Sequence, residues 1–227
     1  MPKRQLAGTA GVIFHVINRG AKRDRLFDGP EDYDAFENLL LACQRSVRIP
    51  IYAYCLMPNH WHLVVSPLND GDLSKYMHDV TGTHAQDWNV AHETVGGGAV
   101  YQARFRPVPV QSDGSFLRVC RYVERNALRA QLVTRAEDWR WSSLWRRQNG
   151  VDGSFLDPWP VARPEPWLEF VNDAIAADTE LSGIRSSVRG SVPYGSSEWR
   201  EATAARLALP NVERGRGRPK KNLPTLF

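Results

Sequence analysis

The chain has 227 residues, enough to bury the core of one main domain with a small appendage. Its 29 lysines and arginines against 25 aspartates and glutamates give a net charge of +4, which suits a polyanionic partner. The three widely spaced cysteines exclude a disulfide framework and a structural zinc cluster. No apolar run approaches ~18 residues and no apolar segment opens the chain, so we expect a cytoplasmic protein with no membrane partner.

Patterns typical of strands and helices alternate along the first 132 residues. β-branched and aromatic runs with a period of two predict strands, and apolar residues three or four apart predict helices. In chain order the predicted elements are a strand over 11–18, a helix that opens at Pro30, strands over 49–57 and 60–66, a helix over 72–90, a strand over 101–111 and a helix over 113–132. This order predicts an α+β fold, with helices packed on a ferredoxin-like antiparallel sheet.

The pattern changes after residue 145. Prolines between residues 158 and 166 predict a connector, and two short helices are expected to follow it. Basic residues gather near both ends of the chain, and the last of them form the run 214–221. We therefore predict a main domain over 8–145, a small helical C-terminal extension over 146–205 and a basic tail over 206–227.

Two histidines stand two residues apart at the start of a predicted strand. Because alternate side chains share one face of a strand, His60 and His62 are expected to point into one site, with Trp61 on the opposite side. Two neutral imidazoles there can bind a divalent metal ion. The same spacing also occurs by chance. His15, on an apolar strand, is more typical of a buried core histidine than of a site residue.

One face of the predicted helix over 113–132 carries polar residues three or four apart, namely Arg118, Tyr122, Asn126 and Arg129. A tyrosine among basic residues can act as a nucleophile on a phosphodiester, and a carboxamide one turn further on can offer an oxygen to a hard metal ion. Arg118, Arg125 and Arg129 are candidates to stabilise the phenolate. The alternative is that the tyrosine is a half-buried packing residue.

Four motifs then occur in a defined order, over residues 14–20, 56–62, 101–105 and 122–130. Together they resemble the single-tyrosine HUH transposases, most closely the REP-associated tyrosine transposases of bacteria, over residues 8 to 145. Two positions depart from the family pattern. Ala127 stands where the family often has proline, and Gln131 where it often has glycine.

The resemblance implies an HUH endonuclease fold and a catalytic role for residues 8–145. By resemblance, His60 and His62 are metal ligands for Mg²⁺ or Mn²⁺, Asn126 is the third ligand and Tyr122 is the nucleophile. It further implies a DNA strand transferase that cleaves and rejoins single-stranded or hairpin DNA of the REP type, through a 5′-phosphotyrosine intermediate and a free 3′-hydroxyl. The implied location is the bacterial cytoplasm, in association with the nucleoid.

Single-stranded DNA is held by basic grooves and by aromatic side chains on which bases stack. The basic residues predicted to line such a groove are Arg19, Lys22, Arg23, Arg104, Arg106, Arg118 and Arg129. Tyr101 and Phe105 are candidates for stacking. Each of these side chains is also compatible with an ordinary solvated surface.

The basic tail resembles an AT-hook, in which Arg216 and Arg218 would enter the minor groove of A·T-rich duplex DNA. A tail of this kind can equally bind phosphates without selectivity.

Three other functions are compatible with parts of the pattern. A domesticated DNA-binding protein or repressor would keep the fold and tail without turnover. A replication-initiator nickase often has paired tyrosines and further domains. An RNA-binding ferredoxin-like module would need exposed aromatic residues on its strands in place of a metal site. The sequence leaves open whether the protein is a monomer or a homodimer.

Overall fold

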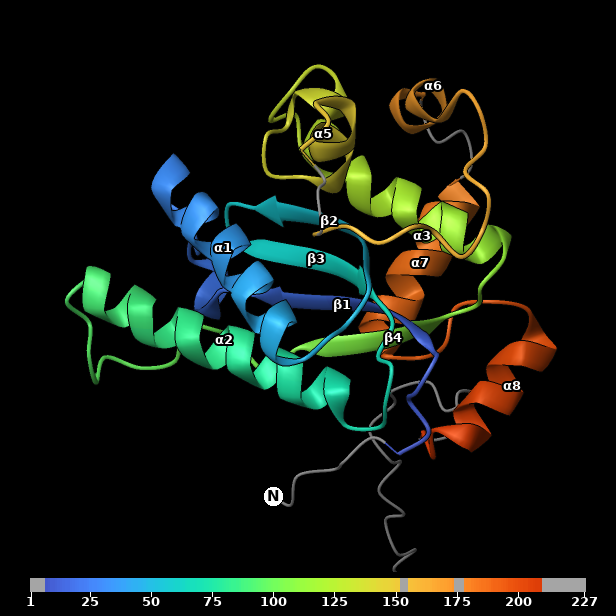
Figure 1. Ribbon diagram of the computed structural model, residues 1–227, viewed down its shortest axis with the longest axis horizontal. Helices are drawn as coiled ribbons and strands as arrows, with labels where there is room; N and C mark the ends of the chain where they lie inside the picture. Colours follow the sequence, from blue (N-terminus) through green and yellow to red (C-terminus); the bar gives the residue numbers. More distant parts are fainter. Residues whose placement is uncertain (1–6, 152–154, 174–177, 210–227) are drawn as a thin grey trace, which may run out of the picture.

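The computed structural model describes residues 7–151, 155–173 and 178–209 (Figure 1). Its strands are β1 (Ile13–Arg19), β2 (Ile51–Met57), β3 (His60–Val65) and β4 (Arg106–Val110). Its α-helices are α1 (Pro30–Ser46), α2 (Asp72–Ala91), α3 (Gly114–Glu124), α4 (Asn126–Arg129), α5 (Ser143–Gln148), α6 (Trp167–Asn172), α7 (Asp178–Gly190) and α8 (Ser197–Arg206). Two short 3₁₀ turns lie at Ala21–Arg23 and Ala136–Asp138.

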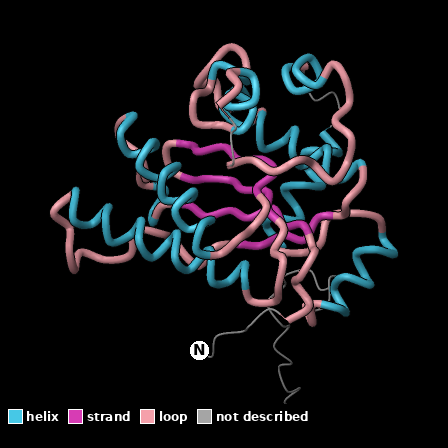
Figure 2. The backbone as a smooth tube through the Cα atoms, viewed as in Figure 1, coloured by secondary structure: helices cyan, strands magenta, loops and turns pink. Residues whose placement is uncertain are grey.

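The four strands form one antiparallel sheet in the order β2-β3-β1-β4. β1 lies inside the sheet between β3 and β4, and α1 and α2 provide the two crossovers, from β1 to β2 and from β3 to β4. Figure 2 shows the strands side by side among the helices. The prediction of an α+β fold with a ferredoxin-like antiparallel sheet is therefore confirmed.

Both faces of the sheet are covered, because successive side chains of each strand point to opposite sides. On one side Phe14, Val16 and Trp61 belong to a core that includes buried residues of α1 and α2. On the other side Ile13 and Val64 belong to a second core with buried residues of α3. Figure 1 shows α1 and α2 across one face, with α3 and α7 toward the other. Polar side chains on the second face can therefore meet α3.

The sequence predicts one continuous helix over 113–132. This is wrong, because the structure has two helices here and the second ends at Arg129. Asp113 caps α3 by accepting a hydrogen bond from the backbone of Ser115 at 2.6 Å. The helix is interrupted at Arg125 and resumes as the short α4. It ends because Gln131 adopts a left-handed φ of 58°, and Leu132 N–H donates to the Ala127 carbonyl at 3.0 Å. This left-handed termination is most commonly made by glycine.

The predicted strand over 101–111 is also shorter than expected. Only Arg106–Val110 pairs as β4, and Tyr101 adds a single bridge to Gly20. The ladder that pairs Ile17 with Arg106 is interrupted after that pair and resumes only at Tyr101, opposite Gly20, where Gln102 N–H donates to the Arg19 carbonyl at 2.9 Å. Residues between Tyr101 and Arg106 therefore form an irregular segment at the end of the sheet.

The C-terminal part folds against the main sheet and contains α6, α7 and α8 rather than two short helices. Trp167 of α6 and Ile184 of α7 belong to the same core as α3. Tyr194 then pairs with Val110 at the free edge of β4. None of the helices in the described ranges is long and apolar enough to cross a membrane.

Candidate functional site

The two histidines occupy the start of β3 and point to the face of the sheet that α3 covers. Their antiparallel partners on β1 are Arg19, opposite His60, and Ile17, opposite His62. The two imidazole rings are nearly perpendicular, with 5.1 Å between centroids. Trp61 points to the opposite core and is fully buried, as predicted. The alternation along β3 therefore brings both imidazoles into one site.

One ring nitrogen of each histidine is engaged, and the other is available. Nδ1 of His60 lies 2.7 Å from Oδ1 of Asn59, so that nitrogen carries the proton and donates. Nδ1 of His62 lies 2.9 Å from Nε2 of His15. Nε2 of His62 is buried and has no hydrogen-bond partner within the described part of the chain. This orphaned nitrogen fits a metal ion better than a structural role.

Burial keeps the imidazoles neutral. Burial, together with the smaller effect of the positive charges of Arg19 and Arg129, lowers the pKa of His60 to about 4. Burial also lowers the pKa of His62 well below its ordinary value, and that of His15 to about 3. At neutral pH all three rings are uncharged, which is the form that binds metal.

Tyr122 of α3 faces this cluster. Its ring stands perpendicular to that of His62, with 5.8 Å between centroids, and lies 5.9 Å from that of His15. The guanidinium carbon of Arg129 lies 4.9 Å from the centroid of the tyrosine ring. The predicted proximity of Tyr122 to the histidines is therefore observed. His15, expected to be a core histidine, is buried and also touches the site.

Asn126, the predicted third ligand, is buried on α4 and is not among the residues that line the pocket. Its Oδ1 accepts a hydrogen bond of 2.6 Å from Arg129, and its Nδ2 has no partner among the described residues. Within the described ranges, no three histidine, cysteine, aspartate or glutamate side chains are arranged so that together they could hold a metal ion. The two histidines thus fit a metal ion, and the carboxamide as third ligand stays a prediction.

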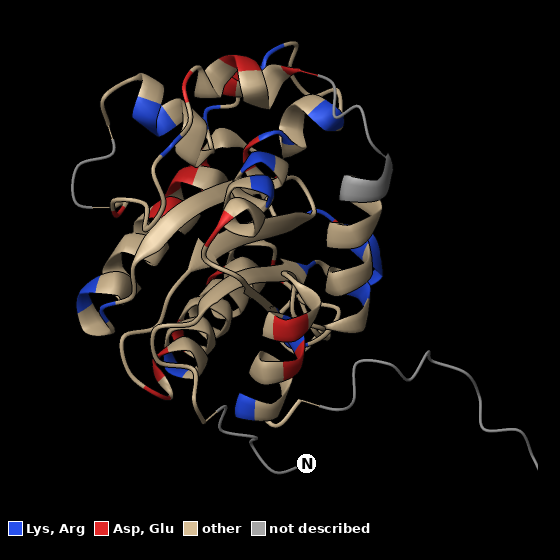
Figure 3. Ribbon diagram, turned by 90° about the vertical axis from the view of Figure 1, so that its right-hand side faces the viewer, with Lys and Arg blue, Asp and Glu red and all other residues tan. Residues whose placement is uncertain are grey.

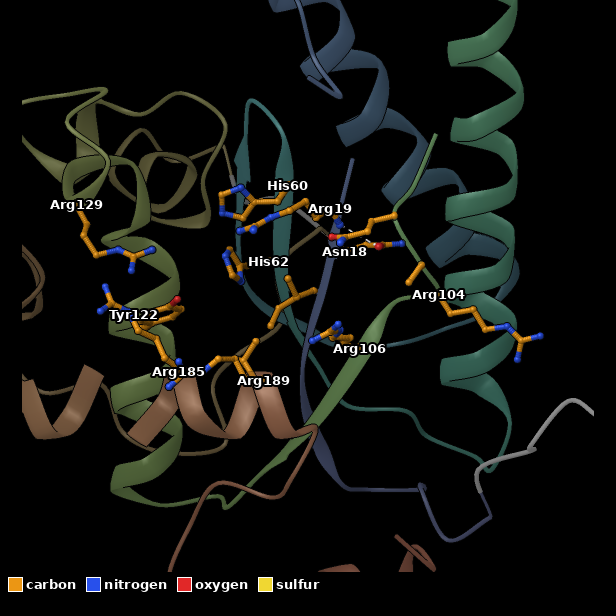
Figure 4. A pocket seen from close by; sticks show the side chains of 14 residues that line it. Asn18, Arg19, His60, His62, Arg104, Arg106, Tyr122, Arg129, Arg185 and Arg189 are labelled. Atoms are coloured by element: carbon orange, nitrogen blue, oxygen red, sulfur yellow. Dashed lines mark hydrogen bonds between the residues drawn. The ribbon is translucent and has the colours of Figure 1, made fainter. Parts of the chain in front are cut away.

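These side chains open into a pocket of about 410 Å³ (Figure 4). Fourteen residues line it, and six of them are arginines, whereas none is an aspartate or glutamate. The arginines are Arg19, Arg104, Arg106, Arg129, Arg185 and Arg189. The side of the molecule shown in Figure 3 carries both basic and acidic residues. The pocket is therefore strongly and locally basic, which favours a polyanion.

Four of the predicted DNA-binding arginines line this pocket, namely Arg19, Arg104, Arg106 and Arg129. Arg118 instead donates to the hydroxyl of Tyr194 at 3.3 Å and to that of Ser115 at 3.0 Å. Lys22 and Arg23 are exposed on the turn after β1, outside the pocket lining. Their contact with DNA stays a prediction. Arg216 and Arg218 lie outside the described residues.

The other arginines proposed to stabilise the phenolate, and the tyrosine proposed to stack on bases, differ in their contacts. Arg125 donates to the backbone carbonyls of Val171 and Asn172, at 2.7 and 2.5 Å, so its guanidinium ties α4 to α6. Only Arg129 of the three candidate arginines lies over the tyrosine ring. Tyr101 was a candidate for base stacking, but it packs against the core and its hydroxyl bonds Nδ1 of His84 at 2.7 Å.

Sequence reasoning missed the contribution of α7, from which Arg185, Val188 and Arg189 reach the pocket. The signal was present: Ile184 and Val188 repeat at helical spacing, and the two arginines are four residues apart beside them. Asn18 and Gln102 were also missed as lining residues.

The fold agrees with the comparisons to known proteins. Residues 9–126 match the family model described as "Transposase IS200 like". This match spans more than half of the chain, so the protein belongs to the IS200-like transposase family.

Among solved structures, the chain is similar to a REP-associated tyrosine transposase bound to a REP hairpin, with 19% identity and a TM-score of 0.51. The similarity covers 78% of this chain and 96% of that chain, and it supports the fold. A putative transposase from Deinococcus radiodurans R1 matches with 16% identity and a TM-score of 0.38, over 49% of this chain and 88% of that one. No match to a curated protein was found.

Proposed function

We propose that this transposase is a metal-dependent DNA strand transferase that uses Tyr122 as its nucleophile. The observation that carries the proposal is the position of this tyrosine beside His62, in a pocket lined by six arginines and no carboxylate. A tyrosine at such a site is suited to attack a phosphodiester, because the pocket attracts the DNA backbone and its arginines oppose the negative charge.

Nε2 of His60 and Nε2 of His62 would hold the divalent ion, Mg²⁺ or Mn²⁺. The ion would supply Lewis acidity to the phosphate oxygens. Asn126 is the proposed third ligand. To bind the ion, its Oδ1 would either lose the hydrogen bond that it accepts from Arg129 or accept that bond and bind the ion at the same time.

The chain's own residues account for the transfer. The Tyr122 oxygen attacks phosphorus, the bond from phosphorus to the 3′-oxygen breaks, and the proton lost by the phenol is matched by the one gained by the 3′-hydroxyl. Arg129 stabilises the negative charge that develops near the ring. Because the phosphotyrosine keeps the energy of the broken bond, a 3′-hydroxyl can reverse the step and rejoin the strand.

The proposed substrate is single-stranded or hairpin DNA of the REP type. The fold of this chain is similar to that of a transposase bound to a REP hairpin, which supports a hairpin substrate. We further propose action in the bacterial cytoplasm, at the nucleoid. An A·T-rich duplex as partner of the tail, the oligomeric state and the division at residues 145 and 205 stay predictions.

The competing function is a DNA-binding protein or repressor without turnover. The two proposals are separated by incubating protein with a hairpin DNA that carries a single-stranded flank, labelled at either end, with Mg²⁺ or Mn²⁺. Strand transfer predicts a metal-dependent cut whose 5′-side product has a free 3′-hydroxyl, lost in Tyr122→Phe and kept in Tyr52→Phe as a matched tyrosine control. Tight binding with no cut in any arm would instead support the repressor.

A further inference from the structure

The helix α7 contributes to the pocket although it lies outside the region that matches the transposase family. The family match ends at residue 126, and α7 spans Asp178–Gly190. Arg185 and Arg189 of this helix line the same pocket as His62 and Tyr122. Figure 4 shows both side chains reaching from α7 toward the tyrosine. A basic wall of the site is thus supplied by the C-terminal part of the chain.

Apolar packing fixes the position of α7 against the domain. Ile184 is only 2% exposed and belongs to the core that contains α3 and the sheet face beneath it. Ser187 is also buried, and Val188 packs against the same core. The two arginines stand beside these buried residues at positions four apart, so they share one side of the helix. Because these buried residues fix α7 in place, the helix holds both arginines at the pocket.

The charge of this wall has no partner in the described protein. Neither arginine forms an ion pair with a carboxylate within the described ranges, and no acidic side chain lines the pocket. Arg19, Arg104 and Arg106 line the pocket from the sheet side, on β1, β4 and the loop before it. Several like charges around one cavity repel one another, and an anion relieves that repulsion. The wall is therefore suited to bind an anionic ligand.

We propose that Arg185 and Arg189 bind backbone phosphates of the DNA strand next to the phosphate that Tyr122 attacks. This inference rests on the proposed function. Arg129 lies over the ring of Tyr122, so it is the arginine placed to contact the phosphate under attack. We therefore assign Arg185 and Arg189 to the phosphates beside it. Two guanidinium groups one helical turn apart suit two successive phosphates, each in a charge-assisted pair. A segment that follows the region matched by the family model is then part of the substrate site.

Methylphosphonate scanning tests this contact directly, because it removes the charge of one phosphate at a time. The protein carries Tyr122→Phe and the buffer contains EDTA, so that binding is measured without cleavage. The variants Arg185→Ala, Arg189→Ala and the double variant are compared with Arg45→Ala, which removes an exposed arginine on α1, across the sheet from the pocket. Arg185→Lys and Arg189→Lys serve as milder variants should an alanine variant fail to fold.

We expect each α7 alanine variant to weaken binding about tenfold at moderate salt, against less than about threefold for Arg45→Ala. We further expect one or two methylphosphonates beside the cleavage position to weaken binding by the parent protein and to have no added effect on the double variant. Equal losses in the α7 and Arg45 variants, or an undiminished effect of those methylphosphonates on the double variant, would overturn the inference.

The two levels of proposal fail differently. Suppose that the protein with intact Tyr122 cuts the hairpin, but that each methylphosphonate weakens binding by the double variant as much as binding by the parent protein. Only the role of α7 is then wrong. If the protein with intact Tyr122 neither binds nor cuts any single-stranded or hairpin DNA, the proposed function itself is wrong and the role of α7 falls with it.

Discussion

His15 and His62 share a hydrogen bond, with 2.9 Å between Nε2 of the first ring and Nδ1 of the second. Both rings are buried and neutral, so one nitrogen donates and the other accepts. If His62 donates through Nδ1, its Nε2 keeps a lone pair toward the pocket, which is the tautomer that binds metal. His15 must then accept, and it acts as a positioning residue for His62.

This relationship predicts different effects for two substitutions of His15. His15→Phe leaves Nδ1 of His62 without a partner, and we expect Mn²⁺ affinity to fall about 10- to 100-fold. His15→Gln keeps an oxygen acceptor and should retain most of the affinity. Titration of Mn²⁺ into the Tyr122→Phe protein, followed by electron paramagnetic resonance, measures binding without catalysis. Equal affinity in both variants and the parent would show that the hydrogen bond does not orient the ligand.

A second prediction concerns Arg129, which contacts both the tyrosine ring and the carboxamide of Asn126. Arg129→Ala removes positive charge near the phenol and frees Oδ1 of Asn126. We expect strand cleavage to fall by about 10²-fold while Mn²⁺ affinity stays the same or rises. Single-turnover cleavage and metal titration on the same preparation provide the two measurements. A fall in metal affinity would contradict the proposed competition between Arg129 and the ion for Asn126.

A third prediction concerns the buried carboxylate that ties α3 to α5 and α6. Glu124 accepts hydrogen bonds from the Ser143 hydroxyl at 2.7 Å and the Trp167 indole at 2.8 Å, and it is fully buried. Glu124→Ala leaves the Trp167 indole N–H unpaired, leaves the Ser143 hydroxyl only its longer bond of 3.3 Å to the Tyr54 carbonyl, and creates a cavity, so we expect the free energy of unfolding to fall by about 2–4 kcal/mol. Urea denaturation measures the loss. A change below about 1 kcal/mol would mean that the contacts contribute little.

A fourth prediction concerns acid stability. Burial lowers the pKa of His84 from 6.5 to about 4, and its Nδ1 bonds Tyr101. In the unfolded chain His84 binds a proton below about pH 6.5, whereas in the folded protein it stays neutral down to about pH 4. The free energy of unfolding therefore decreases as the pH falls from about 6.5 to about 4. The neighbouring charges are Asp32, which raises this pKa, and His92, which lowers it.

His84→Gln keeps an acceptor for Tyr101 and removes the titration. Between about pH 7 and about pH 4.5 we expect the variant to lose ~2–3 kcal/mol less unfolding free energy than the parent. Urea denaturation at the two pH values gives this difference, and the comparison is unaffected by any constant cost of the substitution. Equal losses in the two proteins would contradict a buried, neutral His84.

The sheet and the histidine pair were predictable because they depend on local periodicity. A period of two places His60 and His62 on one face of β3 and Trp61 on the other, whatever the rest of the fold does. The approach of Tyr122 was predictable only through the ordered motifs, since helix periodicity alone shows a face and not what that face meets.

The parts that could not be predicted depend on tertiary contacts. Arg118 shares a helix face with Tyr122, yet it lies one turn away, where Tyr194 provides its partner. Arg185 and Arg189 enter the pocket because Ile184 packs into the same core as residues of α3, which lie more than fifty residues earlier in the chain. The end of α4 depends on a left-handed Gln131, a conformation that propensity assigns to glycine.

The central claim is that Tyr122 forms a covalent bond to DNA in a metal-dependent step, and mass spectrometry tests it most directly. Protein is incubated with hairpin or single-stranded DNA with and without Mn²⁺, denatured, and digested with nuclease and then trypsin. Cleavage after Arg121 and Arg125 releases the tetrapeptide Tyr122–Arg125. The account predicts a nucleotide on the tyrosine of this peptide, present only with metal. A nucleotide on any other residue, or strand cleavage with this peptide unmodified, would contradict the account.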